Sequence, residues 1–182
     1  MPMGSKLNNS LRGFIERQHV FFVATAGPGG RVNVSPKGAD SLRIKSDTAL
    51  RWLNLSGSGN ETAGHLRLSD RITLMFAAFD GDPLILRVYG RGTVLHPRDV
   101  GWEAALAEFP PMAGSRQVID VTIDGVQTSC GTGVPVMPFA RDRVQDELLP
   151  FYEDMGPDGV RDYWRRKNLR TIDGYDTALS DE

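Results

Sequence analysis

The sequence has little of several features that often decide the class of a protein. Its 182 residues include one cysteine, Cys130, so neither an intrachain disulfide framework nor a zinc finger can form. The 21 basic and 23 acidic side chains give a net charge of −2, which argues against general nucleic-acid binding and against an electrostatic membrane anchor. The longest apolar stretch, residues 72–79, is far shorter than the roughly 20 residues of a membrane-spanning helix. We therefore expect no nucleic-acid partner and no membrane association.

Signals for targeting, metal binding and hydrolysis are also missing. Residues 1–9 contain no apolar segment of the kind found in a signal peptide, so a cytoplasmic protein is expected. The three histidines, His19, His65 and His96, are widely spaced without a metal-ligand pattern, and no metal site is predicted. No serine, histidine and acid group suggests a hydrolase triad, and we assign no catalytic side chain.

What the sequence does contain is a succession of short apolar or alternating segments that predict six or seven strands. Turn residues at 27–30, 45–47 and 80–83 predict hairpins between neighbouring strands. Because helices do not alternate regularly with the strands, the order favours an antiparallel split β-barrel over a doubly wound sheet. Side chains fill a barrel this small, so a ligand would lie outside it, in a groove or between subunits. The predicted strands cover residues 20–25, 31–35, 41–44, 48–55, 71–79, 84–95 and 117–126.

Helices are predicted around the barrel and after it. We divide the chain into a barrel domain, residues 1–136, and a helical C-terminal extension, residues 137–182, packed on the same domain or on a partner subunit. Within the extension, Pro150 is expected to interrupt the first helix. Trp164 and the basic residues after it, up to Asn168, are interpreted as a solvent-facing helix surface. The predicted helices cover residues 11–17, 58–69, 97–107, 142–155 and 157–168.

The loop at residues 56–62 carries the strongest local indication of a site. Ser58 and Glu61 have the spacing of a capping box, which predicts a helix start there. Free N–H groups at such a start favour an anion, typically a phosphate. The alternative is an ordinary capped turn, and this stretch taken alone favours the turn because it lacks the pattern of a P-loop.

A second indication lies at the end of a predicted strand, in Ser35-Pro36-Lys37-Gly38. Lys37 is the only lysine between Lys6 and Lys45, and a hydroxyl lies two residues before it. These residues suit a strand end that faces a phosphate, although a surface lysine at a hairpin exit is the alternative that the stretch alone favours. The two indications support each other if the barrel brings residues 35–38 and 56–62 together.

The segment around Cys130 is a weaker candidate. Its glycines, including Gly131, could let the backbone approach a ligand closely. The local sequence supplies no basic neighbour that would make a reactive thiolate, so an unreactive cysteine is favoured.

In these stretches the chain resembles the pyridoxamine 5′-phosphate oxidase-like proteins with the FMN-binding split-barrel fold. Four stretches in order carry the resemblance, which spans about residues 11–136. They are residues 21–38, 52–62, the strand pair 72–79 with 86–92, and residues 129–135.

The resemblance implies a homodimer with two flavin sites at the subunit interface. It implies that the strand end with Ser35 and Lys37, and the helix start with Asn60 and Thr62, hold the FMN phosphate. The strand 52–54 would lie along the ribityl chain and the ring. The implied cofactor-binding residues are Ser35, Pro36, Lys37, Trp52, Leu53, Asn54, Ser58, Asn60, Glu61, Thr62, Cys130 and Gly131.

The function that this implies is an FMN-dependent oxidoreductase acting on a small organic substrate. A deazaflavin-dependent reductase of the same fold is one alternative, and a flavin- or haem-binding protein without turnover is another. Pyridoxal phosphate synthesis itself is not expected. Glu61 and Thr62 stand where members with that activity usually carry a basic pair, and their tryptophan- and arginine-bearing C-terminal segment is missing.

Overall fold

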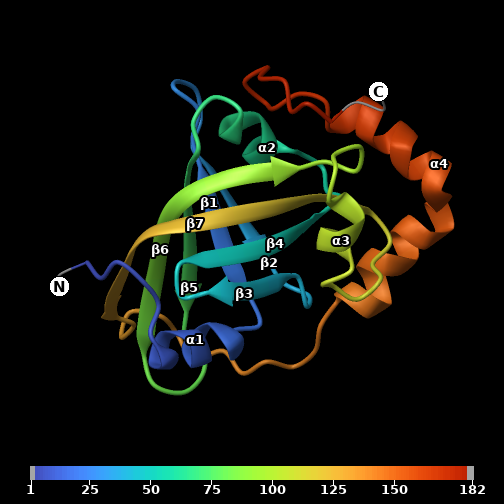
Figure 1. Ribbon diagram of the computed structural model, residues 1–182. Coiled ribbons are helices and arrows are strands. Elements are labelled where there is room, and N and C mark those ends of the chain that lie inside the picture. Colours follow the sequence, from blue (N-terminus) through green and yellow to red (C-terminus); the bar gives the residue numbers. More distant parts are fainter. Residues whose placement is uncertain (1–2, 180–182) are drawn as a thin grey trace.

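One antiparallel sheet of seven strands forms the frame of the computed structural model, which describes residues 3–179 (Figure 1). The strand order is β2-β1-β5-β6-β7-β4-β3, so β2 and β3 are the edges of the described sheet. The sheet curls into a split barrel, which confirms the predicted fold class. The strands are β1 (Phe21–Thr25), β2 (Asn33–Lys37), β3 (Leu42–Ser46), β4 (Ala49–Leu55), β5 (Arg71–Ala77), β6 (Leu84–Leu95) and β7 (Ser115–Cys130).

The two longest strands, β6 and β7, connect the halves of the barrel. β7 pairs with β6 along its length and also with β4, and a bulge between Tyr89 and Gly90 shifts the β6–β7 register. Gly90 lies against the backbone of Thr122, where an added Cβ atom would clash. The last residues of β7, 127–130, lie outside the predicted strand because they are polar and lack an apolar alternation, although they pair fully with β6.

Two apolar clusters flank β4, because successive side chains of a strand point to opposite faces. Trp52 belongs to the main barrel cluster with Leu74, Phe76 and Leu86, whereas Leu53 packs with the cluster beneath α3 (Trp102–Leu106). β4 is therefore fixed by packing on both of its faces. The buried polar residue Asn54, which comes next in this strand, has its backbone position fixed by the same packing.

The helices at 61–66 and 102–106 are shorter than predicted, whereas the first helix covers 9–16 in place of the predicted 11–17. Pro150 lies in the first turn of α4, a position that tolerates proline, and the kink falls instead at Gly156, which has φ 66° and precedes Pro157. Predicting the interruption at Pro150 was therefore wrong, whereas the predicted break between residues 155 and 157 is confirmed by the kink at Gly156. The helices are α1 (Asn9–Glu16), α2 (Glu61–Leu66), α3 (Trp102–Leu106), the π-helical turn η1 (Val144–Leu148) and α4 (Leu149–Lys167).

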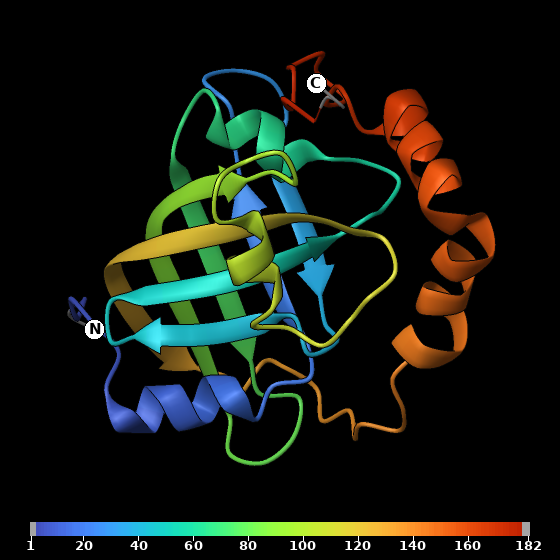
Figure 2. The same ribbon diagram turned by 45° about the vertical axis from the view of Figure 1, so that its right-hand side comes forward.

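The end of the chain returns to the barrel. After β7 the chain runs in an irregular path to α4, which stands beside the sheet, and residues 168–179 then cross over α2 (Figure 2). We call residues 164–179 the C-terminal arm. No helix within residues 3–179 is long and apolar enough to cross a bilayer.

Candidate functional site

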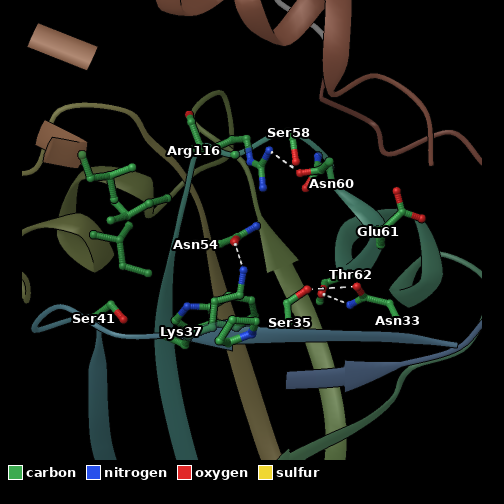
Figure 3. A pocket seen from close by; sticks show the side chains of 18 of the residues that line it. Asn33, Ser35, Lys37, Ser41, Asn54, Ser58, Asn60, Glu61, Thr62 and Arg116 are labelled. Carbon is green, nitrogen blue, oxygen red and sulfur yellow. Dashed lines mark hydrogen bonds between the residues drawn. The ribbon is translucent and has the colours of Figure 1, made fainter. Parts of the chain in front are cut away.

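A cavity of about 740 Å³ lies where β2, β4, the loop after β4 and the C-terminal arm meet (Figure 3). This volume is in the range of pockets that bind small molecules and cofactors, roughly 300–1,000 Å³. Of the twelve residues predicted to bind a cofactor, ten line it. They are Ser35, Pro36, Lys37, Trp52, Leu53, Asn54, Ser58, Asn60, Glu61 and Thr62.

The two indications that the sequence left separate meet in this cavity. Asn33, Ser35 and Lys37 alternate along β2 and line the cavity, whereas Val34 between them is exposed. The Ser35 hydroxyl donates to Asn33 Oδ1 at 2.9 Å, and the Asn33 amide donates to Thr62 Oγ1 at 3.3 Å (Figure 3). The second of these bonds ties the first residue of β2 to the first turn of α2.

Lys37 is a cation with uncharged partners. Its Nζ lies 3.5 Å from Asn54 Oδ1 and 5.0 Å from the centre of the Trp52 ring. No carboxylate of residues 3–179 forms an ion pair with it. Burial lowers the pKa of Lys37 to about 8, and the positive charge of Arg116 contributes to the lowering.

Arg116, at the start of β7, is the second cation of the cavity and was missed by the sequence analysis. It is 2% exposed, and its NH1 donates to the Gly59 carbonyl at 3.0 Å and to Asn168 Oδ1 at 2.7 Å. Its Nε is buried without a hydrogen-bond partner. Burial lowers the pKa of Arg116 to about 10, and within the described chain no carboxylate pairs with it.

A buried amide pair supports Lys37 from below. Asn54 donates from Nδ2 to Gln117 Oε1 at 3.0 Å, and these two residues are direct partners across β4 and β7. Because the Asn54 carbonyl oxygen faces the lysine, Gln117 must offer its own oxygen to Asn54, and Gln117 Nε2 is left buried without a partner. The pair holds the cation without neutralising it.

The chemistry of the cavity is therefore that of an anion site. Two poorly solvated positive charges repel each other and lack a counter-ion among the described residues, so an anion between them would stabilise both. The predicted capping box is absent, because Glu61 accepts from the backbone N–H of Ile172 at 3.1 Å and Asn60 occupies the N-cap position without a side-chain bond to the helix backbone. With six residues, α2 adds little dipole of its own. Lys37 and Arg116 carry the preference for an anion.

Cys130 and Gly131 are not brought to this cavity. Cys130 ends β7 opposite Leu84, and it is exposed. Gly131 lies so close to the backbone of Pro83 and Leu84 that no side chain fits, which gives a packing reason for glycine there. Their assignment to a cofactor site stays a prediction.

The patch at the end of α4 is only partly a solvent-facing surface. Arg165, Arg166 and Lys167 are exposed as expected. Asn168 is fully buried, however, and the Trp164 indole donates to the Ser56 hydroxyl at 2.7 Å. A buried asparagine after three basic residues has no signature in the sequence, because its partners lie 52 and 111 residues away.

The fold and the site together define a class: a split-barrel protein with a cation-lined cavity against the end of an edge strand. Residues 7–130 match the family model described as pyridoxamine 5′-phosphate oxidase. The chain is 34% identical over 185 aligned residues to the pyridoxamine 5′-phosphate oxidase family protein ustO of Aspergillus flavus, covering 92% of this chain and 74% of that protein. The chain belongs to the pyridoxamine 5′-phosphate oxidase family.

Solved structures share the fold at low sequence identity. A pyridoxamine 5′-phosphate oxidase candidate from Lactobacillus delbrueckii superposes with a TM-score of 0.56 and 20% identity, covering 70% of this chain and 99% of that one. HupZ of Group A Streptococcus gives 0.55 and 19%, covering 66% and 91%. At these identities the likeness establishes the architecture alone.

Proposed function

We propose that the cavity binds FMN and that the protein is a flavin-dependent oxidoreductase acting on a small organic substrate. The observation that carries this proposal is the pair of cations that line the cavity, the half-buried Lys37 and the buried Arg116, which are both held by neutral partners. Membership of the pyridoxamine 5′-phosphate oxidase family supports the same conclusion.

The residues present fit a phosphorylated flavin. Lys37 and Arg116 would meet the phosphate, with hydroxyl donors from Ser35 and Thr62 beside them. The cavity wall formed by β4, with Trp52 as its largest side chain, would lie along the rest of the molecule. When bound, a flavin supplies electron or hydride transfer, and the protein binds it, orients it and excludes water. Because the flavin itself would carry the electrons, no catalytic side chain is required, and we assign none.

We propose that a second copy of the chain completes the site. Val34 on the edge strand β2 is 61% exposed, and it lies between the cavity-lining residues Asn33 and Ser35; Val32, just before the strand, is 70% exposed. Paired apolar side chains on an open edge favour contact with another surface. A homodimer that buries them would place its interface next to the cavity, as the family resemblance implies.

Haem is a poorer fit to this cavity. Haem iron needs an axial ligand such as histidine, cysteine, methionine or tyrosine. None of these residue types is among the described residues that line the cavity. A deazaflavin coenzyme is the alternative cofactor, to be distinguished by experiment.

The proposal is tested by the absorption spectrum of the purified protein, followed by identification of the cofactor released on denaturation. We expect the bands of an oxidised flavin, and we expect them to bleach when the protein is reduced and to return when an acceptor is added. Protein that stays colourless and does not bind added FMN would contradict the proposal. Binding of the deazaflavin in its place would establish the alternative, and bound flavin without turnover would contradict the enzymatic part.

The affinity for FMN should depend on pH through Lys37. Its pKa of about 8 in the ligand-free protein means that the cation is lost as the pH rises above that value. We therefore expect FMN affinity to fall between pH 8 and 9.5, by up to about tenfold for each pH unit above the pKa. Lys37→Arg keeps its charge throughout this range, so its affinity should stay level. Fluorescence titration of both proteins measures this, and an identical fall in both would contradict the assignment.

A further inference from the structure

The C-terminal arm, residues 164–179, begins in the last turn of α4 and forms one wall of the cavity, although it lies outside the region matched by the family model. Its residues Lys167, Arg170, Thr171 and Ile172 line the cavity together with the residues of the barrel. Asn168, among them in sequence, points away from solvent and is 0% exposed. The question is what this buried asparagine does beside Arg116.

Asn168 joins three parts of the cavity wall. Its Oδ1 accepts from Arg116 NH1 at 2.7 Å, and its Nδ2 donates to the Gly57 carbonyl at 2.9 Å. Its backbone carbonyl accepts from Asn60 Nδ2 at 3.3 Å and from Thr177 Oγ1 at 2.6 Å. One residue of the arm thus fixes the position of the arginine and of both ends of the loop 57–60.

The chemical type of this partner matters for the charge of Arg116. A carboxylate at the same place would form an ion pair and cancel the positive charge of the guanidinium. An amide oxygen fixes the orientation of the guanidinium and leaves its charge for a ligand. Asn54 plays the same part toward Lys37, so both cations of the cavity are held by amides. The Arg116 Nε atom stays buried without a hydrogen-bond partner, which is unfavourable in the ligand-free protein and is expected of a donor that binds an anion.

Other bonds keep the arm docked and do not involve Arg116. The Trp164 indole donates to Ser56, and the backbone N–H of Ile172 donates to the Glu61 carboxylate. Beyond the cavity, Asp173 pairs with Arg31. Because these contacts are independent of Asn168, its side chain can be changed while the arm retains most of its attachment.

We infer that Asn168 is a positioning residue for anion binding: it holds Arg116 and the loop 57–60 ready for the phosphate of the cofactor without neutralising the arginine. The C-terminal arm then contributes to phosphate binding through Asn168. This inference rests on the proposed function for the identity of the cofactor, but its core, an anion held by Arg116, does not require a flavin.

The decisive variant is Asn168→Asp, which keeps an acceptor for Arg116, cancels its charge and removes the donor to the Gly57 carbonyl. We expect FMN affinity to fall at least about tenfold, whereas the affinity for riboflavin, which lacks the phosphate, changes less than about twofold. Asn168→Ala, which removes the acceptor, should likewise lower the affinity for FMN and leave the affinity for riboflavin nearly unchanged. A purely structural role would weaken FMN and riboflavin binding equally.

The matched control is Thr177→Val, which removes the hydroxyl bond to the Asn168 backbone and touches neither Arg116 nor the cavity. It should lower thermal stability while the ratio of FMN to riboflavin affinity stays at the wild-type value. Asn168→Asp protein that binds FMN as tightly as wild type would overturn the inference and leave the flavin proposal standing.

Inorganic phosphate separates the two proposals. If wild-type protein fails to bind FMN but binds inorganic phosphate in calorimetry, the flavin proposal fails, and the inference is judged by phosphate binding. Loss of phosphate binding in Asn168→Asp would then support it, and unchanged binding would overturn it. Wild-type protein that binds neither FMN nor phosphate would overturn both.

Discussion

Replacing Lys37 by methionine should weaken FMN binding and at the same time stabilise the ligand-free protein. The hydrogen bond from a charged donor to the phosphate is expected to contribute about 1.5–3 kcal/mol, so affinity should fall roughly 10- to 150-fold. In the empty cavity the same charge is poorly solvated and repelled by Arg116, so its removal should raise the free energy of unfolding by about 1 kcal/mol or more. A variant that binds FMN more weakly but is more stable without it would show that Lys37 contributes to ligand binding and not to folding.

The stabilisation by Lys37→Met should depend on pH. The folded-state pKa of about 8 lies below the unfolded value of about 10.5, so the folded protein loses this proton first as the pH rises. Between those values the unfolded chain binds more protons, and the stability of the wild-type protein rises with pH. The advantage of the variant is therefore largest below pH 8 and disappears toward pH 10.5.

Urea denaturation of both proteins at pH 7 and pH 9.5 measures this stabilisation, and FMN titration at pH 7 measures the change in affinity. Lys45→Met is a matched control, because Lys45 is a more exposed lysine paired with Glu108 outside the cavity. It should change FMN affinity little. A Lys37→Met protein that is less stable than wild type and binds FMN normally would show that Lys37 has a structural role.

Trp52→Ala should cause a large loss of stability. The side chain is 1% exposed and packs edge-on against Phe21, with their ring centres 6.3 Å apart. Truncating a buried tryptophan leaves a cavity and typically costs about 3–5 kcal/mol. Because the ring also lies beneath Lys37 Nζ, the folded fraction should bind FMN less tightly as well.

Trp102→Ala is the matched control for Trp52→Ala. Trp102 is buried in the other apolar cluster, beneath α3, and does not line the cavity. It should lower the melting temperature by a comparable amount without changing FMN affinity at temperatures where the variant is folded. Equal losses of FMN affinity in both variants would show that Trp52 has no specific role in FMN binding.

The sequence was most informative where local rules decide the structure. Turn residues and alternating apolar patterns predicted the order of strands and helices, and β6 was predicted with its observed limits, 84–95. Errors occurred at helix ends, where tertiary contacts compete with local propensity. The predicted capping box failed because Glu61 bonds to Ile172, which is 111 residues away.

The site could be predicted only where its residues are close in sequence. Ser35 and Lys37 share one strand end, and Asn60 and Thr62 share one helix start, so local composition was enough to mark them. Arg116 lies one residue before the predicted limit of its strand, and an arginine there is indistinguishable in sequence from an exposed strand end. Only the pairing of β4 with β7, and the return of the arm, place it in the cavity.

The most direct test of the central claim, that this cavity is built for a phosphorylated flavin, is a parallel titration of the cofactor-free wild-type protein with FMN and riboflavin at pH 7. Lys37 and Arg116 should make FMN bind at least about a hundredfold more tightly, since each charged contact contributes roughly tenfold or more. Equal affinities for the two compounds, or binding of neither, would contradict the account.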